Sequence, residues 1–134
     1  MRYEKLIIHT DGGARNNPGP AGIGAVIAAD GKVVKEISEY IGETTNNQAE
    51  YKAVIRALEE AKKLGADELE FYLDSELVVR QFNRIYKVRD KDLAPLFMKV
   101  YNLAQNFKKV TFKHIMRERN KEADMLVNRA IDNR

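Results

Sequence analysis

Four acidic residues are the candidates for chemistry in this chain: Asp11, Glu50, Asp74 and Asp124. Asp11 ends an apolar run that begins at Leu6, and an ionised carboxylate at the edge of a core strand is costly unless a cation meets it. Carboxylates held together share protons or bind metal, because their mutual repulsion disfavours a bare ionised cluster. The chain has no Cys and only two His, so an all-oxygen site would suit Mg²⁺ or Mn²⁺ better than Zn²⁺.

Each of these acids also has an ordinary structural interpretation. Asp11 could begin a turn, Asp74 could cap a helix, and Asp124 could be favoured by the dipole at a helix N-terminus. Glu50 could be an exposed residue of its helix. The hypothesis of a shared site therefore depends on the elements that carry the four acids and on whether they meet.

Those elements follow from hydrophobic periodicity and from turn residues. We expect strands at 6–10, 22–29, 32–40, 68–74 and 110–115, with a hairpin turn at Asp30-Gly31. The glycine- and proline-rich segment 12–20 predicts a loop, and 83–92 predicts an irregular connection. We expect helices at 45–64, 75–82, 93–107 and 120–131.

Two helix starts carry specific signals. Thr45 and Gln48 form the pattern of a capping box, and we expect Gly65 to end the helix that follows Thr45. Glu50 lies on the apolar stripe of this helix, so its carboxylate should point toward the sheet. Asn120 is expected to cap the last helix, which carries Asp124.

The predicted order β-β-β-α-β-α-α-β-α favours an α/β protein with a mixed five-stranded sheet. The first three strands are expected to be antiparallel, with helices on both faces of the sheet, and residues 1–134 should form a single domain. Ligand sites of open α/β sheets collect outside the carboxyl ends of strands. Asp11 and Asp74 are predicted at such ends.

Composition narrows the class of protein. The 134 residues carry a formal net charge of +3 and 44% hydrophobic residues, which is typical of a globular protein, and the sequence pI near 9.1 favours anionic partners. No apolar stretch approaches the roughly 20 residues needed to cross a bilayer, and no secretory signal is evident. With no Cys as well, we expect a cytoplasmic monomer without membrane segments.

Five motifs, spread over nearly the whole chain, occur in this order: Thr10-Asp11-Gly12-Gly13, Asn17-Pro18-Gly19-Pro20, Thr45-Asn46-Asn47-Gln48-Ala49-Glu50, Asp74-Ser75 and Asn120-Lys121-Glu122-Ala123-Asp124. The ordered set resembles the successive motifs of type I ribonuclease H. The resemblance implies a ribonuclease H-like fold and an endonuclease that hydrolyses the RNA strand of RNA/DNA hybrids. It further implies 5′-phosphate and 3′-hydroxyl ends on the products.

The resemblance also implies two divalent ions, Mg²⁺ or alternatively Mn²⁺, held by the four carboxylates. Asp11 would bridge both ions, Glu50 and Asp74 would complete one ion site, and Asp124 would complete the other. Two ions about 4 Å apart can activate a water on one side of a phosphodiester and stabilise the leaving oxygen on the other. No covalent protein nucleophile is then needed.

Several further residues match family positions that bind the hybrid. They are Gly12, Asn17, Thr45, Asn46, Asn47 and Glu76. Asn17 and Asn47 would contact the minor groove, where 2′-hydroxyls are displayed, and Thr45 and Asn46 would receive a phosphate of the DNA strand. Asn and Thr are also ordinary loop and cap residues. Glu76 replaces the Gln of many relatives, so it can accept a hydrogen bond but not donate one.

Two departures from the family distinguish this chain as a short form. Many relatives carry a His in a mobile loop before the last helix, whereas the connection here is only 116–119. We expect His114 to be a strand residue, and Arg117 is our candidate for an auxiliary group near the second metal. The basic handle that some relatives insert at 83–92 is missing, and no separate hybrid-binding domain is expected. Hybrid affinity would then depend on Arg15, Lys87, Arg89 and the basic strip near residue 113. This strip consists of the basic residues of 107–121, which are Lys108, Lys109, Lys113, Arg117, Arg119 and Lys121.

Two other functions stay open. A nucleic-acid-binding module could retain the fold without chemistry, although the presence of all four acids disfavours it. Another nuclease of the same superfold, such as a resolvase or an integrase-like enzyme, is the second alternative, because a fold alone does not determine a substrate. The motif at residues 45–47 favours the hybrid.

Overall fold

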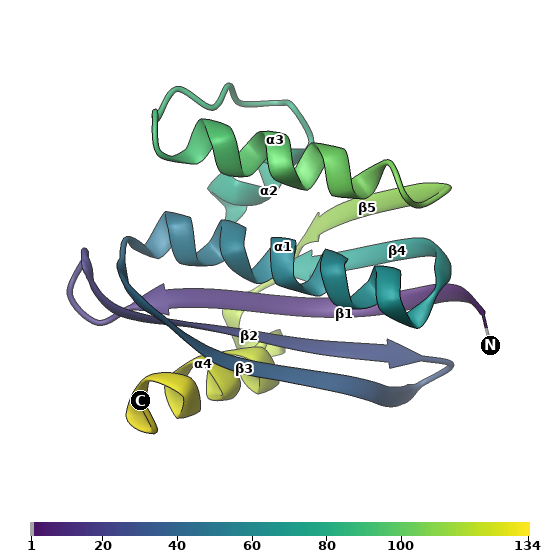
Figure 1. The fold of residues 1–134 in the computed structure, drawn as a ribbon, viewed down its shortest axis with the longest axis horizontal. Helices are drawn as coiled ribbons and strands as arrows, with labels where there is room; N and C mark the ends of the chain where they lie inside the picture. Colours follow the sequence, from purple (N-terminus) through teal and green to yellow (C-terminus); the bar gives the residue numbers. More distant parts are fainter. Residues whose placement is uncertain (1) are drawn as a thin grey trace.

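The computed structural model of the protein describes residues 2–134 and shows one mixed sheet with helices on both faces (Figure 1). In the described residues the sheet has the strand order β3-β2-β1-β4-β5. β1 pairs with β2, and β2 with β3, in antiparallel fashion, whereas β1 with β4 and β4 with β5 are parallel. The strands are β1 (Tyr3–Ala14), β2 (Gly19–Ala29), β3 (Lys32–Thr44), β4 (Ala66–Leu73) and β5 (Lys109–His114). The predicted α/β class and antiparallel start are confirmed.

The helices divide between the two faces of the sheet. They are α1 (Asn46–Leu64), α2 (Glu76–Phe82), α3 (Leu93–Ala104) and α4 (Lys121–Asp132), with a 3₁₀ turn at Arg117–Arg119. α1 and α3 lie together on one side, and α4 lies on the other (Figure 1). α3 ends at Ala104 rather than at the predicted Phe107. Within residues 2–134 no helix is both long enough and apolar enough to span a bilayer.

The main core lies between α1 and the sheet. Leu6 and Ile8 of β1 are fully buried there together with Phe71 of β4 and Leu58 of α1. The apolar stripe of α1 supplies this packing, and Glu50 belongs to the same buried stripe. The inward direction predicted for Glu50 is therefore confirmed.

Both ends of α1 follow their local signals. The Thr45 hydroxyl accepts a hydrogen bond from the Gln48 backbone N–H at 3.2 Å, which satisfies one free donor of the first turn. Gly65 has a φ of 80° and donates its N–H to the Ala61 carbonyl at 3.0 Å. Only half of the capping box forms, because the Gln48 side chain accepts from the Thr44 hydroxyl at 2.7 Å instead of reaching back to the Thr45 N–H.

β1 does not end at Asp11, and this part of the prediction is wrong. Asp11 pairs with Gly24, and the β1–β2 pairing continues to Ala14, so the predicted loop of residues 12–20 shrinks to 15–18. The glycine at position 12 allows a close approach rather than a turn. A Cβ on Gly12 would lie 2.3 Å from the Ala49 carbonyl, so β1 and α1 meet here with no room for a side chain.

The unequal lengths of β1 and β4 create the place for a site. Their parallel pairing keeps one register and ends at the pair His9–Tyr72, while β1 runs on to Ala14. In the same register, Asp11 would lie opposite Asp74, the first residue after β4. Beyond the end of β4 the flank of β1 is open, and α1 can reach it from one face and α4 from the other.

Candidate active site

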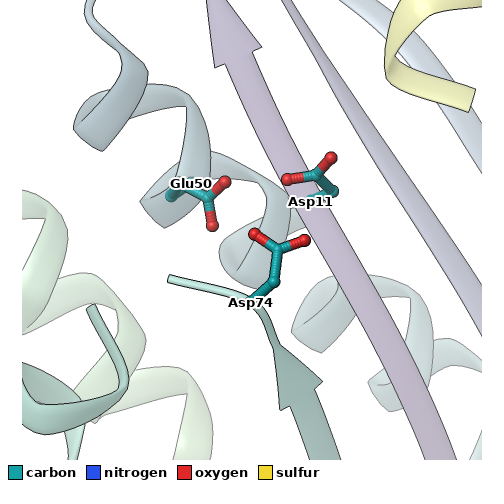
Figure 2. Close-up of side chains that lie close together, drawn as sticks. All are labelled: Asp11, Glu50 and Asp74. Carbon is teal, nitrogen blue, oxygen red and sulfur yellow. The ribbon is translucent and has the colours of Figure 1, made fainter. Parts of the chain in front are cut away.

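Three carboxylates from three different elements meet at this opening (Figure 2). Asp11 comes from β1, Glu50 from α1, and Asp74 from the end of β4, and one oxygen of each lies within 4.8 Å of the others. Asp11 is 8% exposed and Glu50 7% exposed. The close approach of Asp11 and Asp74 follows from the shared register of their strands.

Asp124 contributes to the same place from the opposite face of the sheet. It lies in the first turn of α4 and lines, with the three other acids, an open cleft of about 380 Å³. Its negative charge is among the groups that raise the pKa of Asp11. The structure therefore gathers all four acids at one cleft.

The backbone of β1 holds two of these acids. The Gly12 N–H donates to Asp11 Oδ1 at 3.0 Å and to Glu50 Oε1 at 3.1 Å. Glu50 Oε2 is buried and has no hydrogen-bond partner among residues 2–134. A buried oxygen left unpartnered carries a desolvation cost, so Glu50 has an acceptor available for a further ligand.

Electrostatics disfavour the ionised cluster. Burial raises the pKa of Asp11 to about 7, with further contributions from the charges of Asp74 and Asp124 and an opposing one from Glu50. Burial and the charge of Asp11 raise the pKa of Glu50 well above its usual range. Asp11 and Glu50 consequently tend to retain protons near neutral pH unless a cation replaces them.

The residues fit a hard divalent cation. Every donor at the meeting point is a carboxylate oxygen, the ligand type preferred by Mg²⁺ and Mn²⁺, and one buried oxygen of Glu50 is unpartnered within the described chain. Asp11, Glu50 and Asp74 are the residues placed to hold such an ion.

The predicted hybrid-binding residues divide into two groups. Gly12, Asn46 and Asn47 line the cleft. Asn17 and Thr45 have local structural partners: Asn17 Oδ1 accepts from the Asn46 N–H at 3.0 Å, and Thr45 caps α1. The Asn46 side chain also accepts from the Ala14 N–H at 2.7 Å. These contacts fix the 15–18 loop against the start of α1.

Glu76 and His114 are not among the residues that line the cleft. The Glu76 side chain is 60% exposed and lies 3.7 Å from Arg80 Nε. His114 is the last residue of β5 and is exposed, as expected for a strand residue. Arg117, at the start of the 3₁₀ turn, lines the cleft beside Asp74 and Asp124.

The basic residues expected to bind the hybrid differ in their surroundings. Arg15 lines the cleft, and its Nη1 lies 2.5 Å from Asp132 Oδ1. Lys113 lies on β5 with its Nζ 3.4 Å from Glu70 Oε1. Lys87 and Arg89 are exposed in the connection between α2 and α3.

Asn120 has a role that the sequence did not indicate. Asn120 occupies the N-cap position of α4 as predicted, but its side chain makes no capping hydrogen bond. Instead, its Nδ2 donates to the Thr10 carbonyl at 2.9 Å and to Asp74 Oδ2 at 3.0 Å. Its partners lie 110 and 46 residues away, so no local pattern could have found them.

Comparison with known proteins adds independent information. A family model described as "Reverse transcriptase-like" matches residues 9–130. A bifunctional protein of Mycobacterium tuberculosis is 44% identical over 130 residues, which cover 96% of this chain and 36% of the relative. A ribonuclease HI of Halobacterium salinarum is 41% identical over 132 residues, 98% of this chain and 66% of the relative. The chain thus spans about a third of the first relative and 66% of the second.

Solved structures match at nearly full length. The N-terminal RNase H domain of the mycobacterial protein has a TM-score of 0.92 at 43% identity, covering 96% of this chain and 99% of that one. RNase H1 of Halobacterium salinarum has a TM-score of 0.94 at 39% identity, covering 97% and 99%. An RNase H1 isolated from compost, solved in complex with an RNA/DNA hybrid, has a TM-score of 0.91 at 50% identity, covering 96% and 97%. The predicted fold is confirmed.

Proposed function

This chain belongs to the ribonuclease H family, and from that membership we propose that it hydrolyses the RNA strand of RNA/DNA hybrids, leaving 5′-phosphate and 3′-hydroxyl ends. The observation that carries the proposal is the meeting of three carboxylates, from β1, α1 and the end of β4, within 4.8 Å. The compost RNase H1, which was solved with a hybrid, supports the choice of substrate.

Asp11, Glu50 and Asp74 would hold one divalent ion, and Asp11 with Asp124 would hold a second. Mg²⁺ is the ion we propose, with Mn²⁺ as an alternative, because the donors are carboxylates alone. Divalent ions bound in such a site lower the pKa of water and stabilise charge that develops on a leaving oxygen. The raised pKa of Asp11 supports this assignment, since an acid that resists ionisation alone gains most from a cation.

The chain's own groups would orient the reaction. The Gly12 N–H holds Asp11 Oδ1 and Glu50 Oε1, so two of the acids keep fixed positions while the cleft is open to a substrate strand. Arg117 lines the same cleft, and we propose that its guanidinium binds a phosphate oxygen next to the scissile bond, as guanidinium groups do well. In this role it replaces the loop His of longer relatives.

Hybrid recognition would begin at the N-terminus of α1. Asn47 lines the cleft and would read 2′-hydroxyls in the minor groove, together with the Gly12 backbone. Thr45, Asn46 and Asn17 would present a phosphate-binding turn to the DNA strand, and Glu76 would accept one hydrogen bond. Arg15, Lys87, Arg89 and the basic strip near residue 113 would supply phosphate contacts and hence a marked salt dependence.

One sheet and one main core support a single catalytic domain over the described residues. We further propose that the protein works as a monomer in the cytoplasm.

The test is cleavage of a hybrid with a labelled RNA strand, with Mg²⁺ or with EDTA. Duplex RNA and duplex DNA of the same sequence serve as parallel substrates. We expect hybrid cleavage only with Mg²⁺, and a loss of at least about 10³-fold in kcat for Asp11→Asn, because a central ligand is removed. Glu70→Gln, an acid on the neighbouring strand β4 outside the cleft, is the matched control.

Three outcomes would contradict the proposal. Hybrid binding without cleavage would indicate a binding module. Preference for duplex DNA would indicate another nuclease of the superfold. Equal loss of turnover in Asp11→Asn and Glu70→Gln would mean that the cluster has no special role.

Arg117 and His114 can be separated by matched alanine variants. Because Arg117 lines the cleft and His114 does not, we expect Arg117→Ala to lower kcat by about tenfold or more, the size of a typical lost charge-assisted contact. His114→Ala should leave kcat within about twofold of the parent. Steady-state cleavage of the labelled hybrid measures both, and the reverse ranking would assign the auxiliary role to His114.

A further inference from the structure

We propose that Asn120 is a positioning residue that fixes Asp74 relative to Asp11, so that the two carboxylates can share a divalent cation. Its side chain is only 1% exposed and therefore acts through its neighbours rather than on a substrate. The inference rests on the proposed function, because it concerns the same cluster. It adds a buried amide to the acids and names its task.

The amide joins the two strands that carry the acids. Asn120 Nδ2 donates to the Thr10 carbonyl at 2.9 Å and to Asp74 Oδ2 at 3.0 Å. Thr10 immediately precedes Asp11 in β1. One nitrogen atom thus donates hydrogen bonds both to the backbone next to Asp11 and to the carboxylate of Asp74.

This hydrogen-bonded bridge lies beyond the point where β1 and β4 pair through their backbones. The β1–β4 pairing ends at His9–Tyr72, two residues before Asp11 and Asp74. Backbone hydrogen bonds between the two strands therefore do not extend to the level of the carboxylates. The Asn120 amide bridges the two segments where the next backbone hydrogen bond of the ladder would lie. It donates to the Asp74 side chain and not to the Asp74 backbone.

The backbone of Asn120 also contacts the fourth acid. The backbone carbonyl of Asn120 accepts a hydrogen bond from the Asp124 N–H at 3.1 Å. Asp124 therefore lies one helical turn further along α4. Asn120 consequently makes hydrogen bonds to Asp74 and to the residue before Asp11 through its side chain, and to Asp124 through its backbone.

The residue type fits this task. An Asn side chain offers two donor hydrogens on one planar nitrogen, whereas Asp offers none when ionised and Ser offers one. Both donors of Asn120 are used, one on each strand. Its Oδ1 is buried without a partner in residues 2–134, a cost that a purely packing residue would avoid.

The experiment is a double-mutant cycle read by Mn²⁺ affinity, measured by electron paramagnetic resonance of free Mn²⁺ without any substrate. The four proteins are the parent, Asn120→Ala, Asp74→Asn and the double variant. We expect Asn120→Ala to weaken Mn²⁺ binding about tenfold in the parent, as loss of an outer hydrogen bond to a ligand does. In the Asp74→Asn background the same change should alter affinity less than about twofold, because its effect passes through Asp74.

Two further variants keep the test decisive. Asn120→Ser retains a small polar side chain and replaces Asn120→Ala if that variant does not fold, as judged by circular dichroism. Asn83→Ala is the matched control, because Asn83 Nδ2 also donates to a strand carbonyl, that of Phe112, at 3.0 Å. It should bind Mn²⁺ as the parent does.

Hybrid kinetics add a second readout. Because Asn120 is buried, its variants should lower kcat while KM for the hybrid stays within about twofold of the parent value. Parent-like Mn²⁺ affinity in folded Asn120 variants, or an equal loss in both backgrounds, would overturn the inference. If instead the parent neither binds Mn²⁺ nor cleaves a hybrid, the proposed function itself fails.

Discussion

Two acids on neighbouring strands of the sheet, Glu70 and Asp11, have opposite electrostatic surroundings. Glu70 of β4 accepts a hydrogen bond from the Tyr72 hydroxyl at 2.6 Å and lies 3.2 Å from Lys5 Nζ and 3.4 Å from Lys113 Nζ. The Tyr72 hydrogen bond and the two ammonium groups lower the pKa of Glu70 to about 2. Asp11, on the neighbouring strand β1, has a pKa raised to about 7, mainly by burial.

The difference distinguishes an acid with a structural role, Glu70, from an acid placed to bind a ligand, Asp11. At Glu70 the fold provides two cations and a hydroxyl, so the carboxylate is satisfied within the chain. Around Asp11 it gathers Glu50, Asp74 and Asp124 instead. The second arrangement is unfavourable for folding alone, and a bound dication is the partner that would make it favourable.

The largest predicted effect is on the stability of the protein in EDTA. The pKa of Asp11 rises from 3.8 in the unfolded chain to about 7 in the fold, so between these values the folded chain binds more protons. The free energy of unfolding therefore falls as pH rises. Because Asp11 and Glu50 influence each other's protonation, this fall belongs to the pair and should be on the order of a few kcal/mol between pH 4 and pH 8. Urea unfolding of the parent and of Asp11→Asn at both pH values measures it.

In that experiment Asp11→Asn removes the repulsion between the Asp11 carboxylate and the neighbouring acids without changing the shape of the side chain. We expect the variant to be more stable than the parent at pH 8 in EDTA, with the difference shrinking toward pH 4. An Asp11→Asn variant less stable than the parent at pH 8 would contradict the claim that the Asp11 carboxylate, unlike that of Glu70, destabilises the metal-free fold.

A smaller effect is expected from Mg²⁺ itself. At pH 8 and at a concentration ten times its Kd, Mg²⁺ should stabilise the parent by about 1.4 kcal/mol, because it binds only the folded cluster. Asp11→Asn should gain much less. Thermal unfolding with Mg²⁺ or EDTA detects the difference, and equal gains in both proteins would show that the ion acts elsewhere.

The smallest predicted effect is at Glu70. Its pKa is lowered from 4.5 to about 2, so its contribution to stability is fully present above pH 4.5 and is lost as pH falls toward 2. Because the two lysines are about half exposed, we expect Glu70→Gln to cost about 1 kcal/mol at pH 7. Urea unfolding at pH 7 and pH 3 measures this cost, and a variant as stable as the parent at pH 7 would refute the structural role.

Local sequence signals predicted most of the fold. The cap at Thr45, the stop at Gly65 and the apolar face of α4 are encoded within a few residues. The sequence also placed Asp11 and Asp74 each at the carboxyl end of a strand. That these two strands are neighbours in one register is known only from the structure.

Long-range contacts account for what could not be predicted. Gly12-Gly13 has the composition of a turn, yet β1 continues through it paired with β2, and Ala49 of α1 packs directly on Gly12. The partners of the Asn120 amide lie on β1 and after β4. Nothing near Gly12 or Asn120 in the sequence indicates either contact.

Proton release on Mg²⁺ binding tests the central claim most directly. Isothermal titration calorimetry at pH 6.5, in two buffers of different ionisation enthalpy, counts the protons displaced as the ion binds. Because Asp11 and Glu50 hold protons in the metal-free cluster, we predict that the parent binds Mg²⁺ and releases at least about half a proton per chain, and that Asp11→Asn releases fewer. Binding without proton release, or no binding to the parent, would contradict the claim that these acids are gathered for a cation.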